Sequence, residues 1–207
     1  PLICFAVKSN TNLKILKEIK KFNLGADVVS IGELMKALKA GIKAQKIVFS
    51  GVGKTKTEIE YAINKRILLI NAESKSEILE IERIAKSKKR KINIGIRLNP
   101  NTDAKTINQI STGKKENKFG VDEKTFLDLL SYIKKSKNLD LKCLSVHIGS
   151  QILDNQPYSK MLSVINKVIK KAKHTFEYID LGGGIGIDYL HNKNKFNLKK
   201  YSLDIQK

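Results

Sequence analysis

A lysine and a histidine stand where an enzyme could use them, each within or directly after a short apolar run. Lys8 follows the run ICFAV (3–7), and His147 lies between Val146 and Ile148. A lysine anchored at the end of a buried strand can present its amine for imine formation. By position alone, Lys8 could equally be an ordinary surface lysine, and His147 a core histidine with satisfied nitrogen atoms. Both are therefore candidate catalytic residues that need a second line of evidence.

A run of three glycines, 182–184, follows the apolar run FEYIDL (176–181). Because glycine has no Cβ, the backbone N–H groups of such a run can point into one concavity and bind an anion. A tight turn would use the same glycines, so both interpretations remain open. The triplet GKT (53–55) is not a P-loop, because the first glycine of that motif would fall at Val48. Nor is GGGIG (182–186) a dinucleotide fingerprint, because its sixth position is Ile187.

The elements that would position these residues alternate along the whole chain. Short, β-branched apolar runs are typical of strands buried on both faces, as in a parallel sheet. Between them, apolar residues recur every three or four positions, which is the spacing of amphipathic helices. Ser76, followed by Glu80, suggests the start of one of these helices. The seven runs span 3–7, 26–30, 46–50, 67–71, 92–98, 141–148 and 176–181.

Seven strand–helix units predict an α/β fold with parallel strands. Two architectures fit: a (β/α)8 TIM-type barrel that is incomplete, with about seven of its eight strands, or a doubly wound open sheet. A polar or glycine position follows every run, from Lys8 to the glycines 182–184. In a barrel all strand ends converge on one site, whereas an open sheet uses mainly those at a switch point. We therefore expect the barrel, as a single domain over residues 1–207, with a long loop at 99–120.

The charge balance raises the question of nucleic-acid binding. Forty Lys and Arg residues against 20 Asp and Glu give a formal net charge of +20. Only four of the basic residues are Arg, and the densest basic run, KSKKRK (86–91), has no aromatic neighbour. Nucleic-acid sites usually combine clustered arginine and lysine with aromatic side chains for stacking. We expect solvated lysines and no specific nucleic-acid partner, and keep a polyanion-binding surface as the alternative.

Other classes of protein are excluded by what the sequence lacks. The longest apolar stretch, 2–7, is far too short to span a membrane, and no secretory signal is recognisable. Two cysteines within apolar runs indicate a reduced, cytoplasmic setting. No cluster of His, Cys, Asp and Glu has the spacing of metal ligands, so we expect no metal.

Five segments, taken together, resemble the diaminopimelate decarboxylases. This family belongs to the pyridoxal-phosphate decarboxylases built on an alanine-racemase-like barrel, which include ornithine and arginine decarboxylases. The segments occur in the family's order and cover essentially the whole chain. The STGKKENKFG stretch and HIGSQ resemble the diaminopimelate branch in particular. The segments are CFAVKSN (4–10), GADVVSIGEL (25–34), RLNPNTDAKTINQISTGKKENKFGV (97–121), SVHIGSQI (145–152) and YIDLGGGIGI (178–187).

The resemblance implies a role for individual residues. Lys8 matches the lysine that holds pyridoxal 5'-phosphate as a Schiff base, and His147 the histidine whose ring stacks on the cofactor. Ser150 and the glycines Gly182, Gly183 and Gly184 match the phosphate-binding loops. Arg97 matches an arginine near the acidic partner of the pyridine nitrogen, and Asp27 an aspartate close to the lysine.

The implied activity is the decarboxylation of meso-2,6-diaminopimelate to L-lysine, by a homodimer when the protein is full-length. The family's eighth strand, with its Glu-Pro-Gly-Arg motif, and its C-terminal β-domain are absent from these 207 residues. Two alternatives remain open: an ornithine/arginine-type decarboxylase of the same fold, and a non-catalytic barrel.

Overall fold

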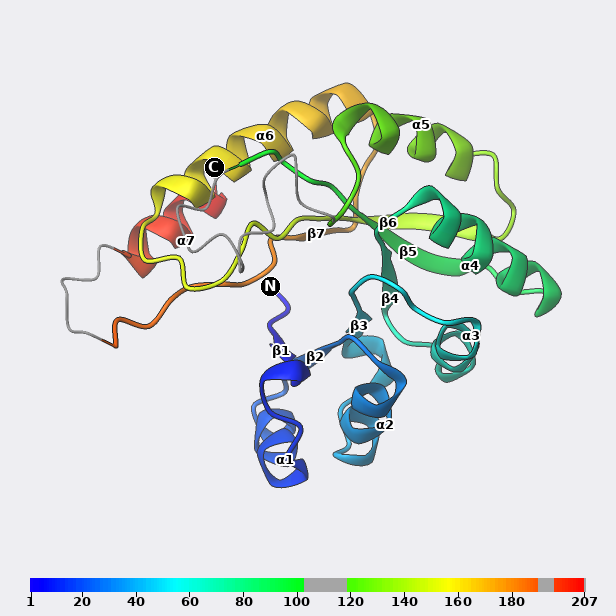
Figure 1. Cartoon of the computed structure of the whole chain (residues 1–207), viewed down its shortest axis with the longest axis horizontal. Helices are drawn as coiled ribbons and strands as arrows, with labels where there is room; N and C mark the ends of the chain where they lie inside the picture. Colours follow the sequence, from blue (N-terminus) through cyan, green and yellow to red (C-terminus); the bar gives the residue numbers. More distant parts are fainter. Residues whose placement is uncertain (103–118, 190–195, 207) are drawn as a thin grey trace. The chain divides into compact units, whose positions relative to one another are not determined.

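The computed structural model describes residues 1–102, 119–189 and 196–206. Most of the long loop expected at 99–120 lies outside these residues. A strand overlaps each of the seven apolar runs, and helices alternate with the strands along the chain (Figure 1). The strands are β1 (Cys4–Ala6), β2 (Gly25–Val28), β3 (Ile47–Phe49), β4 (Leu69–Ala72), β5 (Ile92–Arg97), β6 (Leu139–Ser145) and β7 (Tyr178–Asp180). The α-helices are α1 (Leu13–Lys21), α2 (Ile31–Lys39), α3 (Lys56–Lys65), α4 (Lys75–Ser87), α5 (Glu123–Ile133), α6 (Gln156–Ala172) and α7 (Leu198–Gln206), with 3-10 turns η1 (Val7–Ser9) and η2 (Ala44–Lys46).

The strand order separates the two predicted architectures. The sheet runs β1-β2-β3-β4-β5-β6-β7, so that each strand is hydrogen-bonded to its neighbours in sequence. The pairs from β1 to β5 are parallel, with Ala6 opposite Asp27 and Asn71 opposite Gly95. A doubly wound sheet reverses its strand order at a switch point, and this sheet does not. The order is that of an α/β barrel, and the prediction of a doubly wound sheet as the alternative is excluded.

The chain divides into two compact units. The first unit comprises Pro1–Ile96 and Ser131–Cys143, and the second comprises Arg97–Leu130 and Leu144–Lys207. The expected single domain over 1–207 stays a prediction.

In the first unit, the two faces of the sheet differ in chemistry. One face carries apolar side chains that are at most 1% exposed. The helices α1 to α4, each in contact with the next, bury residues such as Leu16, Leu34, Ile59 and Ile78. Complete burial of one such side chain stabilises a fold by about 1.5–3 kcal/mol. The apolar face therefore helps to hold the unit together, whereas the other face carries Asp27 and Asn71 beside the apolar Val48 and Leu69. The residues of the apolar face include Ala26, Val28, Ile47, Phe49, Ile70, Ala72, Ile94 and Ile96.

Three successive helices of the first unit begin with the same arrangement of a hydroxyl and a glutamate. Ser30, Thr55 and Ser74 are the N-caps of α2, α3 and α4, and each hydroxyl accepts from the backbone N–H three residues later. The glutamate at that third position reaches back to a backbone N–H at or before the cap. The caps satisfy N–H groups that the helix leaves unpaired. The interpretation of Ser76 and Glu80 as a helix start was wrong by two residues, because Ser74 and Glu77 fill these positions.

The second unit is built around α6 and the segments that follow β6 and β7. Val146 donates its backbone N–H to the Asp180 carbonyl (2.8 Å), which pairs the ends of the two strands. Further along, Ile152 and Ile185 form an isolated parallel bridge. The apolar side of α6 is buried through residues such as Met161, Ile165 and Val168. These contacts fix two loops, 146–152 and 181–187, side by side.

Candidate functional site

Lys8 lies in η1, directly after β1, and its side chain is exposed. The preceding Val7 is completely buried, and the Ser9 hydroxyl donates to the Ala6 carbonyl (2.8 Å). The Asn10 N–H donates to the Val7 carbonyl (3.0 Å) and closes the turn. The buried valine and the closed turn thus anchor the backbone while the lysine amine stays accessible to a small molecule.

Asp27 lies on the neighbouring strand β2, on the face of the sheet opposite to Ala26 and Val28. Its Oδ1 accepts a hydrogen bond from the Ser50 hydroxyl (2.5 Å), and the Asn71 side-chain amide donates to that hydroxyl oxygen (3.4 Å). These three residues come from the ends of β2, β3 and β4 and form a polar row. The register places Ala6 opposite Asp27, and Lys8 follows two residues later. Lys8 and Asp27 therefore lie at the same, carboxyl end of adjacent strands.

His147 and the glycine run meet in the second unit. The Gly183 N–H donates to His147 Nδ1 (3.3 Å), and the Gly183 carbonyl accepts from the Tyr158 hydroxyl (3.0 Å). Because Nδ1 accepts from a backbone N–H, the neutral imidazole carries its proton on Nε2. The Asp180 carboxylate accepts from the Gly182 N–H (2.8 Å) and from the Ser145 hydroxyl (2.9 Å). The glycine loop is thus tied to three side chains.

The three glycines differ in what an added side chain would meet. A Cβ on Gly182 would lie 2.6 Å from the Val146 carbonyl oxygen, and one on Gly184 would lie 1.9 Å from that of Gly149. Both have positive φ angles, +68° and +98°. A Cβ on Gly183 would meet nothing within 4 Å. Gly182 and Gly184 let the loops approach, whereas the space at Gly183 is open to an external group.

Two backbone donors and one hydroxyl near this space are unused. Among the described residues, the N–H groups of Ser150 and Gly184 have no hydrogen-bond partner, and neither does the Ser150 hydroxyl. Unpaired N–H groups on adjacent loops, with open space at a glycine, form a cradle of the kind that binds phosphate. The residues present therefore fit an anionic group, and we call Ser150 with 182–184 the anion cradle.

Arg97 is the last residue of β5 and belongs to the second unit. Its side chain is mostly buried, and its guanidinium lies 4.9 Å from the centre of the Phe119 ring. One guanidinium nitrogen donates to the His147 carbonyl (3.5 Å). The arginine thereby supports the backbone of the residue whose ring carries the Gly183 contact.

The predicted site residues fall into two groups. Lys8 and Asp27 lie together in the first unit, and the second unit brings together Arg97, His147, Ser150 and the glycines 182–184. That all of them share one site stays a prediction. The sequence analysis did not identify Tyr158 or Asp180, nor the hydrogen bond between Asp27 and Ser50. An aspartate two residues before a glycine run is an Asx-turn signal that could have revealed Asp180.

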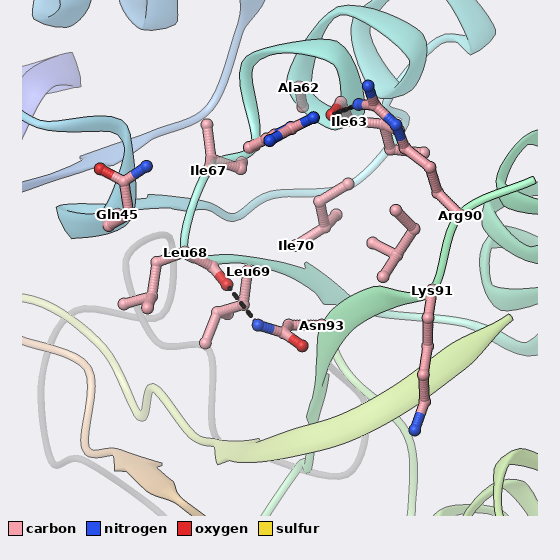
Figure 2. Close-up of a pocket in the computed structure, with 12 residues that line it drawn as sticks. Gln45, Ala62, Ile63, Ile67, Leu68, Leu69, Ile70, Arg90, Lys91 and Asn93 are labelled. Atoms are coloured by element: carbon pink, nitrogen blue, oxygen red, sulfur yellow. Dashed lines mark hydrogen bonds between the residues drawn. The ribbon is translucent and has the colours of Figure 1, made fainter. Parts of the chain in front are cut away.

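A cavity of about 450 Å³ in the first unit lies elsewhere (Figure 2). It is lined by the end of α3 and by the residues around the starts of β4 and β5, whereas Lys8 and Asp27 lie at the carboxyl ends of β1 and β2. Arg90 donates to the Ile63 carbonyl (3.0 Å), and the Asn93 amide to the Leu68 carbonyl (3.4 Å). These polar groups thus bind the backbone at a helix end and a strand start. The cavity is therefore separate from Lys8 and Asp27, the candidate-site residues of the first unit.

The described residues contain neither a cluster of metal-ligating side chains nor a membrane-spanning helix. No group of three or more His, Cys, Asp or Glu residues is placed there to hold a metal ion. No helix in the same residues is long and apolar enough to cross a membrane.

Comparisons with known proteins show which family and which solved structures the chain resembles. Residues 1–207 match the family described as pyridoxal-dependent decarboxylase, pyridoxal binding domain. The chain is 48% identical over 207 residues to a diaminopimelate decarboxylase of Helicobacter pylori strain J99, covering 99% of this chain and 51% of that protein. It is 43% identical over 206 residues to the enzyme of the same name from Campylobacter jejuni, covering 98% and 51%. The chain therefore spans about half the length of the curated relatives it matches.

A solved structure extends the likeness to three dimensions. The crystal structure of diaminopimelate decarboxylase from Helicobacter pylori complexed with L-lysine has a TM-score of 0.95 and 47% identity. The match covers 99% of this chain and 52% of that one. Together with the strand order, this confirms the predicted fold class, an α/β barrel that is incomplete in these residues.

Proposed function

The chain belongs to the pyridoxal-dependent decarboxylases, and on that premise we propose that it carries the cofactor-binding part of a diaminopimelate decarboxylase. The proposed reaction converts meso-2,6-diaminopimelate to L-lysine and CO₂, with pyridoxal 5'-phosphate as cofactor. The observation that carries the proposal is the anion cradle, whose unpaired donors suit the phosphate of the cofactor. The names of the relatives at 48% and 43% identity support this substrate over ornithine or arginine.

Each candidate residue has one task in the proposal. When bound, pyridoxal phosphate supplies the electron sink for the electron pair released as CO₂ leaves the substrate. The Lys8 amine holds the cofactor covalently, and Asp27, fixed by Ser50, stands near that amine. His147 orients the cofactor ring, and the anion cradle holds its phosphate. Arg97 lies near the acidic partner of the pyridine nitrogen.

Reductive trapping tests the role of Lys8. The 207-residue chain is incubated with pyridoxal phosphate, reduced with borohydride and digested with trypsin. A modified Lys8 resists cleavage, so the expected product is the peptide 1–14 carrying the cofactor mass. Lys8→Ala should lose the adduct, and Lys8→Arg should lose it too, because a guanidinium stays protonated and forms no imine.

Lys39→Ala is the matched control, because Lys39 is an exposed lysine at the end of α2. It should keep the Lys8 adduct in full. Trapping that persists on another lysine in Lys8→Ala would contradict the proposed site.

Substrate choice is tested with the full-length protein, by measuring CO₂ release from meso-diaminopimelate, ornithine and arginine. We expect release from diaminopimelate alone. Release from ornithine or arginine would favour the second kind of decarboxylase, and a Lys8 adduct with no release from any substrate would favour a non-catalytic barrel. The homodimer expected for the full-length protein stays a prediction that sedimentation can test.

A further inference from the structure

Tyr158, near the start of α6, makes a contact with the anion cradle that the proposed function does not use. Its side chain is 1% exposed, and its hydroxyl donates to the Gly183 carbonyl (3.0 Å). The ring packs edge-on against Phe196, with ring centres 5.6 Å apart, and lies 5.0 Å from the Tyr201 ring. Aromatic neighbours on two sides fix the direction of the hydroxyl.

The hydroxyl is also fixed as a donor. Burial raises the pKa of Tyr158 well above its usual value, and the neighbouring Tyr201 adds to the rise. Tyr158 therefore stays protonated throughout the physiological pH range and keeps its hydrogen for the Gly183 carbonyl.

A trans peptide links this contact to the cradle. In a trans peptide the carbonyl oxygen and the following N–H point in opposite directions, and no peptide bond in the described residues is cis. Because Tyr158 holds the Gly183 oxygen, the Gly184 N–H must point away from the tyrosine. That N–H is one of the unpaired donors of the anion cradle.

The next peptide is held in the same manner. The Ile152 N–H donates to the Gly184 carbonyl (2.9 Å), and the Gly186 N–H donates to the Ile152 carbonyl (3.0 Å). The loop is therefore clamped on both sides of the Gly184 N–H before any anion arrives. Donors that are fixed in advance need no reorganisation when the anion binds.

We propose that Tyr158 is a positioning residue for the cofactor phosphate, because it aims the Gly184 N–H into the anion cradle. The inference rests on the proposed function. A buried tyrosine hydroxyl needs a hydrogen-bond partner in any fold, so a purely structural role is the competing explanation. If Tyr158 is a positioning residue, loss of its hydroxyl weakens the recognition of phosphate in particular. If its role is purely structural, the loss has no such specific effect.

The test compares two ligands that differ only in phosphate. Equilibrium titration of the 207-residue chain with pyridoxal phosphate and with pyridoxal gives two affinities for each variant. In Tyr158→Phe the ring is kept and the hydroxyl removed, and we expect pyridoxal phosphate to bind about five- to twentyfold more weakly. Pyridoxal, which lacks the phosphate, should bind within about twofold of the wild-type value.

Tyr201→Phe is the matched control, because Tyr201 belongs to the same aromatic cluster and its hydroxyl has no hydrogen-bond partner among the described residues. Both affinities should be unchanged in it. An equal loss for both ligands in Tyr158→Phe, or no loss for either, would overturn the inference. A wild-type chain that binds both ligands equally well would instead overturn the proposed phosphate site itself.

A second measurement does not depend on the fate of the variant. In isotope-labelled wild-type protein, titration with inorganic phosphate should shift the amide signals of Gly184 and Ser150, while that of Gly182, bonded to Asp180, moves less. A Gly184 signal that does not respond to phosphate, while that of Ser150 does, would contradict the positioning role even if Tyr158→Phe proved unstable.

Discussion

The three glycines of the run 182–184 differ in what their positions require, and substitution of each one should affect stability differently. At Gly184 an added Cβ would collide with the Gly149 carbonyl, and the φ angle of +98° is unsuited to a side chain. Gly184→Ala should therefore lower the free energy of unfolding by about 2–5 kcal/mol, and Gly182→Ala by a similar amount. Gly183→Ala should change it by less than about 0.5 kcal/mol, because its Cβ position is open.

Urea unfolding of the three variants measures this, provided that the slope of the transition is unchanged. A loss in Gly183→Ala as large as that in Gly184→Ala would mean that the loop is packed differently. It also follows that substitution of Gly184 is a poor probe of cofactor binding, because it disturbs the protein before any ligand is added.

The sequence analysis named some residues of the candidate site and not others. The difference lies in how far apart in the sequence the contacting residues are. Lys8 and the glycines follow apolar runs and His147 lies near the end of one, so their place at strand ends is visible locally. Tyr158 and Gly183 are 25 residues apart, and Asp27 and Ser50 are 23 apart. Only the packing of α6 against the loop, or of β2 beside β3, creates such pairs. Patterns of apolar spacing carry no information about them.

At the scale of elements, the glutamates that cap α2, α3 and α4 do more than start a helix. The Glu58 carboxylate accepts from the Thr55 N–H (2.9 Å) and from the Ile31 N–H (3.0 Å), and so joins the starts of α2 and α3. Burial acts to raise its pKa, but these backbone hydrogen bonds, together with the Thr55 hydroxyl and the charge of Lys54, outweigh burial, and the net pKa is below the ordinary value of 4.5.

This lowered pKa gives a pH-dependent prediction. A carboxyl group whose pKa is lower in the folded state adds stability above its unfolded pKa, and that contribution is lost as the pH falls through the folded pKa. Glu58→Gln should cost about 1 kcal/mol at pH 7, and the difference from wild type should shrink as the pH falls below 4.5. Glu60→Gln, on the same helix but paired only loosely with Lys56 (3.9 Å), is the control and should have little effect. A Glu58→Gln deficit that is constant from pH 7 to pH 3 would count against this account.

A buried lysine links three elements of the first unit. The Lys54 side chain is 1% exposed, and its ammonium donates to the carbonyls of Gly51 (2.5 Å) and Asn71 (2.8 Å) and to Glu77 (2.7 Å). It thereby joins the loop after β3 to the end of β4 and the first turn of α4. Lys54 is the lysine of the GKT triplet (53–55), which is not a P-loop, and its role in this unit is structural.

Removal of this ammonium should be costly, because the buried Glu77 carboxylate and two carbonyls would lose their donor. Lys54→Met is expected to lower the free energy of unfolding by about 3–5 kcal/mol. Lys56→Met, which removes a lysine that is 59% exposed, should change it by less than about 0.5 kcal/mol. Thermal or urea unfolding distinguishes the two, and equal effects would show that Lys54 is not the link described.

The fold itself was predictable at the level of elements, and the reason is physical. Strands buried on both faces read as continuous apolar runs, and helices with one buried face read as periodic ones, so both patterns survive in the sequence. The start of α4 was misplaced because Ser76 and Ser74 both precede a glutamate at a plausible distance. Only the hydrogen bond from the Glu77 N–H to the Ser74 hydroxyl (3.2 Å) decides between them.

At the scale of the whole molecule, the formal net charge of +20 could be taken for a sign of nucleic-acid binding. The basic run 86–91 is the densest in the sequence, yet part of it is used within the first unit. Arg90 donates to the Ile63 carbonyl, and Lys91 lies 3.4 Å from the Asp140 carboxylate. A run whose cations serve helix ends and ion pairs is a weak candidate for a dedicated nucleic-acid surface.

We therefore expect only weak, non-specific binding to DNA or RNA, carried by the overall charge. Counterion release would make such binding fall steeply with salt, with a log–log slope of about −0.9 for each phosphate neutralised on duplex DNA. A sharper test compares two pairs of lysines at different positions in the chain. Replacing Lys88 and Lys89 by glutamine should reduce low-salt affinity no more than replacing Lys14 and Lys17, two exposed lysines of α1, because each pair removes the same charge. Fluorescence anisotropy across a salt series measures both. If the 88/89 pair alone abolished binding, or if a complex survived physiological salt, the basic run would be a true polyanion site and the lysines would need a second function.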